Sequence, residues 1–366
     1  MKAAPLTIAV ACGGTGGHTF PGVATAQALV QCGHAVTLWL GGRDVETASA
    51  GAWTGPLRRV RATGLGGGMV DGMRAGALFV RAVLISRRFL RADRPDVLLA
   101  MGSYASVGPV LAAQWLHIPI VLHEANAVPG KALKFLSRFA AAVGVGFPAA
   151  RTAFRGRRVE VTGFPLRAQI TAVQAAPRPS GPFTFLVMGG SQGARALNET
   201  VPLALAALRE HSGAPFRVIH LAGRHDAEVV AARYAAAGVD ADVHAFLGEI
   251  WRAYGATDYA VTRAGAATCA ELAVAGVPAL LVPYPHAAGD HQTANARALA
   301  SVGGVDVRAQ VDLSCDWLVK HLADRLADTE RLAAMRRALA TAAVPDADCR
   351  LARLVEQVGG IAHADL

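Results

Sequence analysis

The sequence places a serine inside a glycine-rich turn, and two kinds of chemistry fit that position. Residues 189–193 read Gly-Gly-Ser-Gln-Gly and begin at the end of the apolar run 183–190. The spacing matches G-x-S-x-G, in which Ser191 would be the nucleophile of a serine hydrolase. It also matches a strand–turn–helix junction whose backbone N–H groups bind a phosphate, with Ser191 as a hydrogen-bond donor. A Pro-rich stretch before the strand and Arg195 after the turn favour the anion pocket.

A similar turn near the start of the chain carries a histidine. Residues 13–18 read Gly-Gly-Thr-Gly-Gly-His, between the apolar run 6–11 and a helical pattern. The dinucleotide fingerprint G-x-G-x-x-G fails here, because Thr19 replaces its third glycine and residues 40–42 bring no acidic residue for a ribose. The turn still suits an anion. His18 could take a proton from an acceptor hydroxyl, or it could merely bond the backbone at a helix start.

A third turn, at residues 262–272, combines possible phosphate and ribose ligands. It reads Thr-Arg-Ala-Gly-Ala-Ala-Thr-Cys-Ala-Glu-Leu, which is a strand end followed by a helix start. The N–H groups of Ala266, Ala267 and Thr268 can bind a phosphate there. Glu271 lies about one turn inside the helix, where its two carboxylate oxygens can each accept a ribose hydroxyl.

Polar side chains gather again at residues 283–295, after the next apolar run. The stretch reads Pro-Tyr-Pro-His-Ala-Ala-Gly-Asp-His-Gln-Thr-Ala-Asn. Several donors and acceptors in one loop suit a sugar, because sugar hydroxyls need both. His286 and His291 are candidate metal ligands, but no two further ligands follow at matching spacing, so no metal site is predicted.

The composition predicts a globular α/β protein. The chain has 366 residues, 53% of them hydrophobic, with 39 Gly, and no apolar run reaches the roughly 20 residues that cross a bilayer. The five cysteines are odd in number and irregular in spacing, without a C-x-x-C pair. That usage argues against a disulfide framework or a zinc site and favours a reducing cytoplasm.

Positive charge is concentrated in the first half of the chain. Residues 1–166 hold 18 Lys and Arg against 7 Asp and Glu, a net +11, whereas residues 167–366 hold 18 against 20, a net −2. A basic half indicates an anionic partner, which could be nucleic acid, acidic lipid or a phosphorylated substrate. No basic patch is interleaved with stacking aromatic residues, which argues against nucleic acid. A coding bias towards Arg would explain the excess but not its asymmetry.

The elements that would position these turns alternate between strands and helices. Two series of apolar runs, each followed by helical patterns, flank a Pro-rich stretch at 174–182 that we interpret as a linker. Continuous apolar strands with helical crossovers predict parallel sheets covered on both faces. We therefore expect two doubly wound domains facing a cleft, with ligands beyond the carboxyl ends of the strands. The runs are 6–11, 34–40, 96–102, 119–124, 158–166, 183–190, 216–223, 259–265 and 278–285.

Six stretches together resemble the MurG family of glycosyltransferases. They occur in the family's order along almost the whole chain, so the set is specific although each stretch alone is weak. The stretches are GGTGGH (13–18), GSYASVGP (102–109), HEANAVPG (123–130), GGSQGARALN (189–198), RAGAATCAE (263–271) and PHAAGDHQTAN (285–295).

The resemblance implies the two-domain GT-B fold. Residues 1–166 and a C-terminal helix at about 344–366 would face the acceptor and the membrane, and residues 167–343 would bind UDP-N-acetylglucosamine (UDP-GlcNAc). It implies an inverting, metal-independent hexosyltransferase that needs no cofactor. The sugar would pass to undecaprenyl-diphospho-N-acetylmuramoyl-pentapeptide, converting lipid I to lipid II in peptidoglycan synthesis. The enzyme would be peripheral, on the cytoplasmic face of the plasma membrane, and Ser191 would bind the donor without attacking it.

The resemblance also implies roles for the matching residues. His18 would be the base, with Glu124 and Tyr104 completing the acceptor side of the cleft. Glu271 would hold the ribose and Leu247 would lie near uracil. His291 and Gln292 would contact the sugar hydroxyls. The substrate-binding set is Thr15, Gly16, Gly17, Asn126, Arg167, Ser191, Leu247, Ala266, Ala267, Thr268, Glu271, His291 and Gln292.

Four positions depart from the family's pattern and leave fine recognition open. Ala125 and Leu133 stand where Gln and Asn are common. Phe164 replaces the Asn of G-N-P-x-R, and His291 stands where some members have Gln. Two alternatives share the scaffold, namely a GT-B transferase for another lipid or small-molecule acceptor and a UDP-GlcNAc epimerase. The serine hydrolase is the alternative from another class.

Residues 68–94 supply a candidate membrane surface. Apolar side chains there mix with arginines, and an apolar surface ringed by Arg is typical of proteins bound to anionic headgroups. An ordinary amphipathic helix would instead pack its apolar face inside, and part of this one is expected to do so. The predicted patch is Met73, Leu78, Phe79, Arg81, Arg87 and Arg88.

Overall fold

A parallel sheet forms the centre of each half of the chain, and the chain divides accordingly. The computed structural model describes residues 4–14, 16–42, 46, 50–60, 69–175, 181–190 and 193–361. Unit 1 comprises Met1–Arg167 and Val344–Leu366, and unit 2 comprises Ala168–Ala343. The Pro-rich stretch 174–182, which we expected to be a linker, therefore falls inside unit 2.

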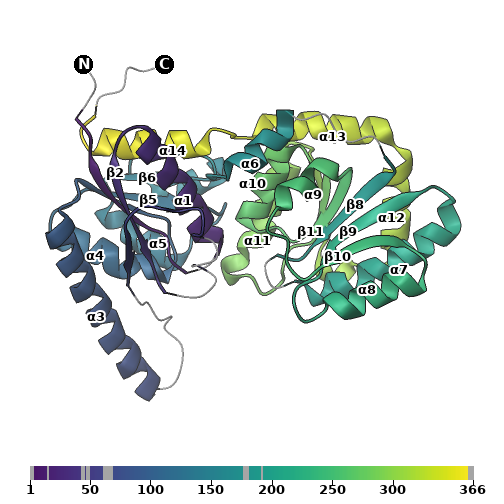
Figure 1. Ribbon diagram of the computed structural model, residues 1–366, viewed down its shortest axis with the longest axis horizontal. Coiled ribbons are helices and arrows are strands. Elements are labelled where there is room, and N and C mark those ends of the chain that lie inside the picture. The colour runs from purple at the N-terminus through teal and green to yellow at the C-terminus, as the bar shows by residue number, and fades with distance from the viewer. Residues whose placement is uncertain are drawn as a thin grey trace. The chain divides into compact units, whose positions relative to one another are not determined.

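The described strands of unit 1 follow the order β3-β2-β1-β4-β5-β6-β7 in one parallel sheet (Figure 1). Helical crossovers join them, because parallel neighbours cannot be joined by a tight turn. The strands are β1 (Thr7–Ala11), β2 (Ala35–Leu40), β3 (Leu57–Arg59), β4 (Val97–Ala100), β5 (Ile120–Glu124), β6 (Ala142–Val145) and β7 (Val159–Val161). The helices are α1 (Gly16–Gln31), α3 (Met69–Asp93), α4 (Val107–Trp115), α5 (Lys131–Leu136) and α14 (Ala347–Val358).

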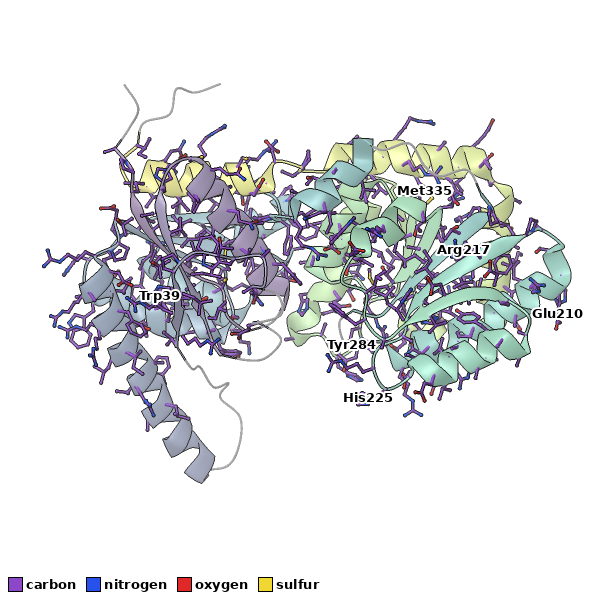
Figure 2. All side chains as sticks on the ribbon, in the orientation of Figure 1. Trp39, Glu210, Arg217, His225, Tyr284 and Met335 are labelled. Carbon is purple, nitrogen blue, oxygen red and sulfur yellow. The ribbon has the colours of Figure 1, made fainter. Side chains whose placement is uncertain are left out.

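Helices cover both faces of the unit 1 sheet, because its strands are apolar on both sides. Helices α1 and α14 pack on the face that carries Ile8 and Val10. Helices α3 and α4 pack on the face that carries Ala9 and Trp39. Trp39, labelled in Figure 2, belongs to this core, and its ring meets that of Phe89 in α3 edge-on, with 5.7 Å between the centroids. Helix α14 thus completes unit 1, although it follows unit 2 in the sequence.

Unit 2 also contains a parallel sheet, with the same relative order of strands. Its described strands follow the order β10-β9-β8-β11-β12-β13, which matches the first six strands of unit 1 in relative order. The strands are β8 (Phe183–Met188), β9 (Phe216–Leu221), β10 (Asp240–His244), β11 (Tyr259–Thr262), β12 (Ala279–Leu281) and β13 (Val305–Val307). The helices are α6 (Ala168–Thr171), α7 (Arg195–Ser212), α8 (Ala227–Ala236), α9 (Ile250–Ala256), α10 (Ala266–Ala275), α11 (His291–Ala300), α12 (Cys315–Ala327) and α13 (Thr329–Ala342).

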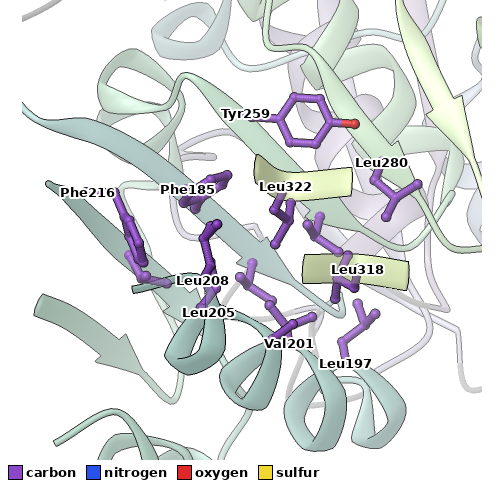
Figure 3. Close-up of a cluster of buried hydrophobic side chains, with 14 of the residues drawn as sticks. Phe185, Leu197, Val201, Leu205, Leu208, Phe216, Tyr259, Leu280, Leu318 and Leu322 are labelled. Carbon is purple, nitrogen blue, oxygen red and sulfur yellow. The ribbon is translucent and has the colours of Figure 1, made fainter. Parts of the chain in front are cut away.

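Helix α7 shows how an amphipathic helix packs in unit 2. Its apolar residues recur every three or four positions, so they lie on one face of the helix. That face packs against the sheet and against α12 in a single cluster of buried side chains (Figure 3). The residues of α7 in this cluster include Leu197, Val201, Leu205 and Leu208. The predicted pair of doubly wound parallel sheets is thus confirmed in both units.

Some strands differ from the apolar runs that predicted them. Strands β3, β6, β10 and β13 were not predicted, because each is short or carries charged residues. Strand β7 ends at Val161, well before the predicted end at residue 166. Gly163, with φ of 76°, and Pro165 follow, and neither continues a strand readily.

The strand order reverses beside β1 in unit 1 and beside β8 in unit 2. In an open α/β sheet, ligands bind beyond the carboxyl ends of the strands at such a point. The turns that follow the two strands at each reversal are therefore where a site is expected. These turns follow β1 and β4 in unit 1, and β8 and β11 in unit 2.

Candidate active site

The turn after β8 depends on glycines that larger residues cannot replace. Gly190 and Gly193 have φ of 97° and 77°, in the left-handed region that favours glycine. A Cβ on Gly193 would lie 2.1 Å from the carbonyl oxygen of Ala222. The turn therefore packs backbone against backbone, and its shape suits close approach to an anion. Ser191 lies outside the described residues, so its predicted role stays a prediction.

Helix α10, after β11, begins without a side-chain cap. Its N-cap is Gly265, which has no side chain to bond the first N–H groups of the helix. Ala266, Ala267 and Thr268 form the first turn, the first of them buried and the other two half-buried. An uncapped helix start attracts an anion, because its N–H groups and dipole both favour negative charge. The structure thus brings the three predicted phosphate ligands to the carboxyl edge of the unit 2 sheet.

Glu271, the predicted ribose ligand, is held by a tyrosine of the neighbouring helix. The hydroxyl of Tyr254 in α9 donates to Glu271 Oε2 at 2.8 Å. Tyr254 is completely buried, so this bond fixes the orientation of the carboxylate. Leu247, predicted to lie near uracil, is half-buried in the loop that joins β10 to α9. Leu247 thus precedes α9 in the chain, and Glu271 is bonded to α9 through Tyr254.

The two residues that begin α11 each offer a ligand one kind of hydrogen-bonding group, a donor on Gln292 and an acceptor on His291. Gln292 Oε1 accepts the backbone N–H groups of Ala264 at 3.2 Å and Tyr284 at 2.9 Å. The side-chain oxygen is therefore occupied, and the amide N–H₂ group is what Gln292 can offer to a ligand. His291 Nδ1 bonds the carbonyl oxygen of Ala288 at 2.8 Å. Because a carbonyl only accepts, Nδ1 carries the proton and Nε2 is the acceptor.

A pocket of about 640 Å³ lies between the turn after β8 and the loops after β12 and β13. Arg263 lines it and is 7% exposed. Its Nη1 donates to the carbonyls of Val282 at 3.1 Å and Pro283 at 3.2 Å, and its Nη2 donates to Gln310 Oε1 at 2.6 Å. Burial lowers the pKa of Arg263. In the sequence Arg263 is only one residue of the stretch 263–271, because the bonds by which it joins neighbouring loops exist only in the folded chain.

The first glycine-rich turn of unit 1 is held from both sides. Ser103 Oγ, after β4, donates to the carbonyl of Gly13 at 2.6 Å. Glu46, after β2, accepts the N–H of Gly14 through Oε1 at 2.6 Å and the N–H of Gly42 through Oε2 at 2.7 Å. The sequence had shown no acidic residue at the end of β2. In the structure, Glu46 lies six residues beyond the end of β2 and is bonded to the turn.

His18 lies in the first turn of α1 beside a second histidine. It is half-buried, and burial lowers its pKa to about 4, so the imidazole is neutral at pH 7. His123 of β5 is fully buried and donates through Nε2 to the carbonyl of Gly163 at 2.9 Å. Burial also lowers the pKa of His123 to about 4, and the nearby His18 lowers it further. The pair favours a neutral imidazole that can accept a proton.

Glu124 closes the loop that follows β5. Its Oε1 accepts the backbone N–H of Asn126 at 2.8 Å and the side-chain N–H of the same residue at 3.1 Å. Its Oε2 accepts the N–H of Gly130 at 3.2 Å. The carboxylate therefore shapes the loop of residues 124–130. Tyr104, predicted with it on the acceptor side, is 60% exposed in the turn after β4.

The remaining predicted residues of unit 1 surround the same edge of its sheet. Gly16 and Gly17 begin α1, and Thr15 lies outside the described residues. The guanidinium of Arg167 lies over the ring of Phe20 in α1, 4.8 Å from its centroid. The predicted catalytic and substrate-binding residues that the structure describes thus fall into two groups, one at the carboxyl edge of each sheet.

Helix α3 exposes apolar side chains next to cations. Leu78 and Phe79 are 38% and 39% exposed, and Arg81 and Arg88 are also exposed. The guanidinium of Arg87 lies over the ring of Trp115, which ends α4. Met73 lies in α3, but its side chain is outside the described part of the chain.

Trp115, at the end of α4, is a part of this surface that the sequence did not reveal. Its side chain is 55% exposed, and the guanidinium of Arg87 sits 4.2 Å from the ring centroid. A single aromatic residue at a helix end gives no pattern in the sequence, so only the packing of α3 on α4 identifies it. In the part of the chain that the structure describes, no helix is both long and apolar enough to span a bilayer.

Two family models match the chain. The glycosyltransferase family 28 N-terminal domain matches residues 8–145, and the C-terminal domain of the same family matches residues 184–351. The first match lies in unit 1, and the second covers most of unit 2 and reaches α14.

Curated relatives match over nearly the whole chain. A protein of Halorhodospira halophila is 43% identical over 96% of this chain and 98% of its own length. A protein of Rhodospirillum rubrum is 41% identical over 96% of this chain and 92% of its own. Both are named UDP-N-acetylglucosamine–N-acetylmuramyl-(pentapeptide) pyrophosphoryl-undecaprenol N-acetylglucosamine transferase. The crystal structure of Acinetobacter baumannii MurG is 30% identical and matches with a TM-score of 0.78 over 96% of this chain.

The chain belongs to the MurG family. The predicted family and the predicted GT-B fold are thereby confirmed. A putative UDP-N-acetylglucosamine 2-epimerase from Listeria monocytogenes also matches, with a TM-score of 0.72 at 14% identity. At that identity only the fold is shared. The scaffold by itself therefore does not separate a transferase of the MurG family from an epimerase.

Proposed function

We propose that the protein transfers N-acetylglucosamine from UDP-GlcNAc to undecaprenyl-diphospho-N-acetylmuramoyl-pentapeptide, converting lipid I to lipid II. The observation that carries this proposal is the 41% and 43% identity, along nearly the whole chain, to two relatives named for this transfer. The glycine-rich turns of the two units support it, because a nucleotide sugar and a diphosphate lipid both present anions.

In this proposal unit 2 binds the donor. Glu271, held by Tyr254, accepts the ribose hydroxyls with little further loss of side-chain freedom. Leu247 packs near uracil. The first N–H groups of α10 and the turn that contains Ser191 bind the diphosphate and stabilise the charge that develops as UDP leaves. No protein nucleophile is needed, because the acceptor itself attacks.

The sugar would meet the start of α11. Gln292 can only donate to it, because its oxygen is occupied by two backbone N–H groups. His291 can accept through Nε2, because its Nδ1 proton is bonded to the carbonyl of Ala288. Neighbouring hydroxyls of N-acetylglucosamine, one accepting and one donating, would match this pair.

Unit 1 would bind the acceptor and activate its hydroxyl. Neutral His18 takes the hydroxyl proton while the oxygen attacks the anomeric carbon and UDP leaves from the opposite side. One displacement of this kind inverts the configuration. The low pKa of His18 keeps the base form available at pH 7, although it makes the imidazole a weak base. Glu124, Asn126 and Tyr104 would shape the loops around the acceptor.

The acceptor is a lipid, so a part of unit 1 must reach the bilayer. We assign this contact to the exposed face of α3 and the end of α4. Leu78, Phe79 and Trp115 would enter the interface, and Arg81, Arg87 and Arg88 would meet anionic headgroups. The protein would then be peripheral, on the cytoplasmic face of the plasma membrane.

The experiment that tests the function follows a labelled sugar. Purified protein is incubated with UDP-GlcNAc labelled in the sugar, with and without lipid I, and the lipid fraction is counted. We expect label in the lipid only when both substrates are present. Conversion of the sugar nucleotide without lipid would instead identify an epimerase. Label transferred only to a different lipid would identify another acceptor, and fluorophosphonate labelling of Ser191 would indicate a hydrolase.

A further inference from the structure

Glu46 is a buried carboxylate that the proposed chemistry does not use. It is completely buried, yet both of its oxygens bond backbone N–H groups at the edge where the site lies. We propose that Glu46 is a positioning residue that fixes the first glycine-rich turn for the acceptor's diphosphate. This inference rests on the proposed function, in which that turn lies on the acceptor side.

The bonds of Glu46 join two loops that follow neighbouring strands. Oε1 accepts from Gly14, after β1, at 2.6 Å, and Oε2 accepts from Gly42, after β2, at 2.7 Å. Short bonds from N–H groups to a carboxylate are among the stronger hydrogen bonds in proteins. The two loops also touch directly, because a Cβ on Gly13 would lie 2.4 Å from Gly41 N. Glycine at these positions leaves the contact entirely to the backbone.

Ser103 holds the same turn from the other side of β1. It follows β4, which is the other neighbour of β1 in the sheet, and its hydroxyl donates to the carbonyl of Gly13 at 2.6 Å. The turn is thus bonded to the loops on both of its flanks. Its backbone is set before any ligand arrives, which lowers the cost of ordering it on binding.

The carboxylate also determines where an anion can sit. The N–H of Gly14 already donates to Glu46, and the negative charge of the carboxylate disfavours a second anion there. A phosphate is therefore directed to the N–H groups that follow, at Gly16 and Gly17, next to His18. In this account Glu46 places the acceptor's charge relative to the base without touching the substrate.

The test replaces Glu46 by glutamine and measures both substrates separately. In Glu46→Gln one oxygen becomes an N–H₂ group, which cannot accept a backbone N–H, so one of the two bonds is lost. We expect the KM for lipid I to rise about tenfold or more, because a bond to a charged group is lost at the turn. The affinity for UDP, bound by unit 2, should stay within about twofold. An unchanged KM for lipid I, or an equal loss of UDP affinity, would overturn the proposal.

Asp96→Asn is the matched control. Asp96 Oδ2 accepts the backbone N–H of Thr7 at 2.8 Å, which is the same kind of bond at the opposite end of β1. This variant should leave the KM for lipid I unchanged. If it raised that KM as much as Glu46→Gln does, the effect would come from general loosening of the sheet, and the proposal would be wrong.

Ser103→Ala tests the same turn if Glu46→Gln does not fold. It removes the bond to Gly13 and the bond that Ser103 Oγ accepts from the N–H of Ala105 at 3.2 Å, and it leaves Glu46 in place. The KM for lipid I should therefore rise about two- to fivefold, with UDP affinity unchanged. An unchanged KM for lipid I in this variant would count against the proposal.

Measurements on the wild-type protein distinguish failure of the proposed function from failure of the role proposed for Glu46. If it transfers no sugar to lipid I, the proposed function fails and this inference falls with it. If it transfers normally while Glu46→Gln keeps its KM for lipid I, only this inference fails.

Discussion

The glycine-rich turns after β1 and β8 occupy the same place in two sheets of the same winding, yet their backbones are bonded differently. In unit 1, Gly14 donates to the carboxylate of Glu46. In unit 2, Gly193 donates to the carbonyl of Gly190 at 3.1 Å, within the turn itself. No carboxylate is bonded to the described residues of the unit 2 turn, and the uncapped start of α10 lies at the neighbouring strand end.

This difference shows that a strand–glycine–helix junction can be completed in two ways. Its N–H groups can be used by a carboxylate of the same chain, or they can be kept for the anion of a ligand. We infer that the unit 2 turn is shaped for the donor diphosphate. The backbone of the unit 1 turn is fixed by bonds within the protein, and it positions the acceptor and His18. Variants at the two turns should therefore affect different substrates.

The largest expected effect is that of His18→Ala. Removing a general base costs typically 10²- to 10⁴-fold in turnover. We expect kcat to fall by about this factor, while calorimetry of UDP binding gives an unchanged affinity. Asn126→Ala, which alters a neighbouring loop of unit 1, should act mainly on the KM for lipid I. Normal turnover in His18→Ala would show that the base is another residue.

Gly193→Ala should weaken donor binding and leave acceptor binding unchanged. The new Cβ would lie 2.1 Å from the carbonyl oxygen of Ala222, and the residue would keep a φ of 77° that favours glycine. The turn must shift, and we expect UDP affinity to fall by at least about 2 kcal/mol, from backbone strain and overlap together. Gly213→Ala is the control, because Gly213 has φ of 60° with nothing within 4 Å of its Cβ position. It should lower stability by about 1 kcal/mol and leave UDP affinity unchanged.

Glu271→Ala should weaken UDP binding by about 1–3 kcal/mol, the usual cost of hydrogen bonds lost to a charged group. Titration calorimetry measures it directly. Tyr254→Phe removes only the hydroxyl that orients the carboxylate. It should cost less than Glu271→Ala, on the order of 1 kcal/mol. Equal UDP affinity in Glu271→Ala and the wild type would refute the ribose assignment.

The smallest expected effect is that of pH on turnover. Burial lowers the pKa of His18 to about 4, so its neutral form predominates at pH 6 and at pH 8. We expect kcat/KM for lipid I to be flat over that range as far as His18 is concerned. It should fall only as the pH drops through about 4. A fall centred near pH 6.5 would mean that the histidine titrates as it does in water.

Folding stability should follow a different pH profile from turnover. His18 and His123 have pKa values lowered to about 4, and in the unfolded chain their pKa returns to its ordinary value near 6.5. Between those limits the unfolded chain binds more protons than the folded one. The contribution of these two histidines to the free energy of unfolding is therefore fully present above about pH 6.5, and it decreases as the pH falls towards 4.

The turns were predictable from the sequence because glycine and apolar runs leave a local signal. Strand β1 is apolar throughout, and glycines with positive φ follow both β1 and β8. Strand β6 left no such signal, because it is four residues long and contains a glycine. Gly144 is there for a tertiary reason. A Cβ would lie 2.9 Å from Thr162 Oγ1 and 3.0 Å from Leu351 Cδ1, and Leu351 comes from the far end of the chain.

The residues that hold the site in shape were less predictable than the residues that would bind substrate. Glu46 lies 32 residues from Gly14, and nothing in the local sequence marks it as the partner of that turn. Arg263 was visible in a motif, but its bonds to Val282 and Gln310 depend on how neighbouring loops meet. Such residues act through backbone groups, which have the same chemistry at every position.

One set of kinetic measurements tests the division between the two turns most directly. Transfer of labelled sugar to lipid I is measured for the wild type, Glu46→Gln and Glu271→Ala, with each substrate varied in turn. We predict transfer by the wild type, a raised KM for lipid I alone in Glu46→Gln, and a raised KM for UDP-GlcNAc alone in Glu271→Ala. No transfer by the wild type, or the same KM raised in both variants, would contradict the account.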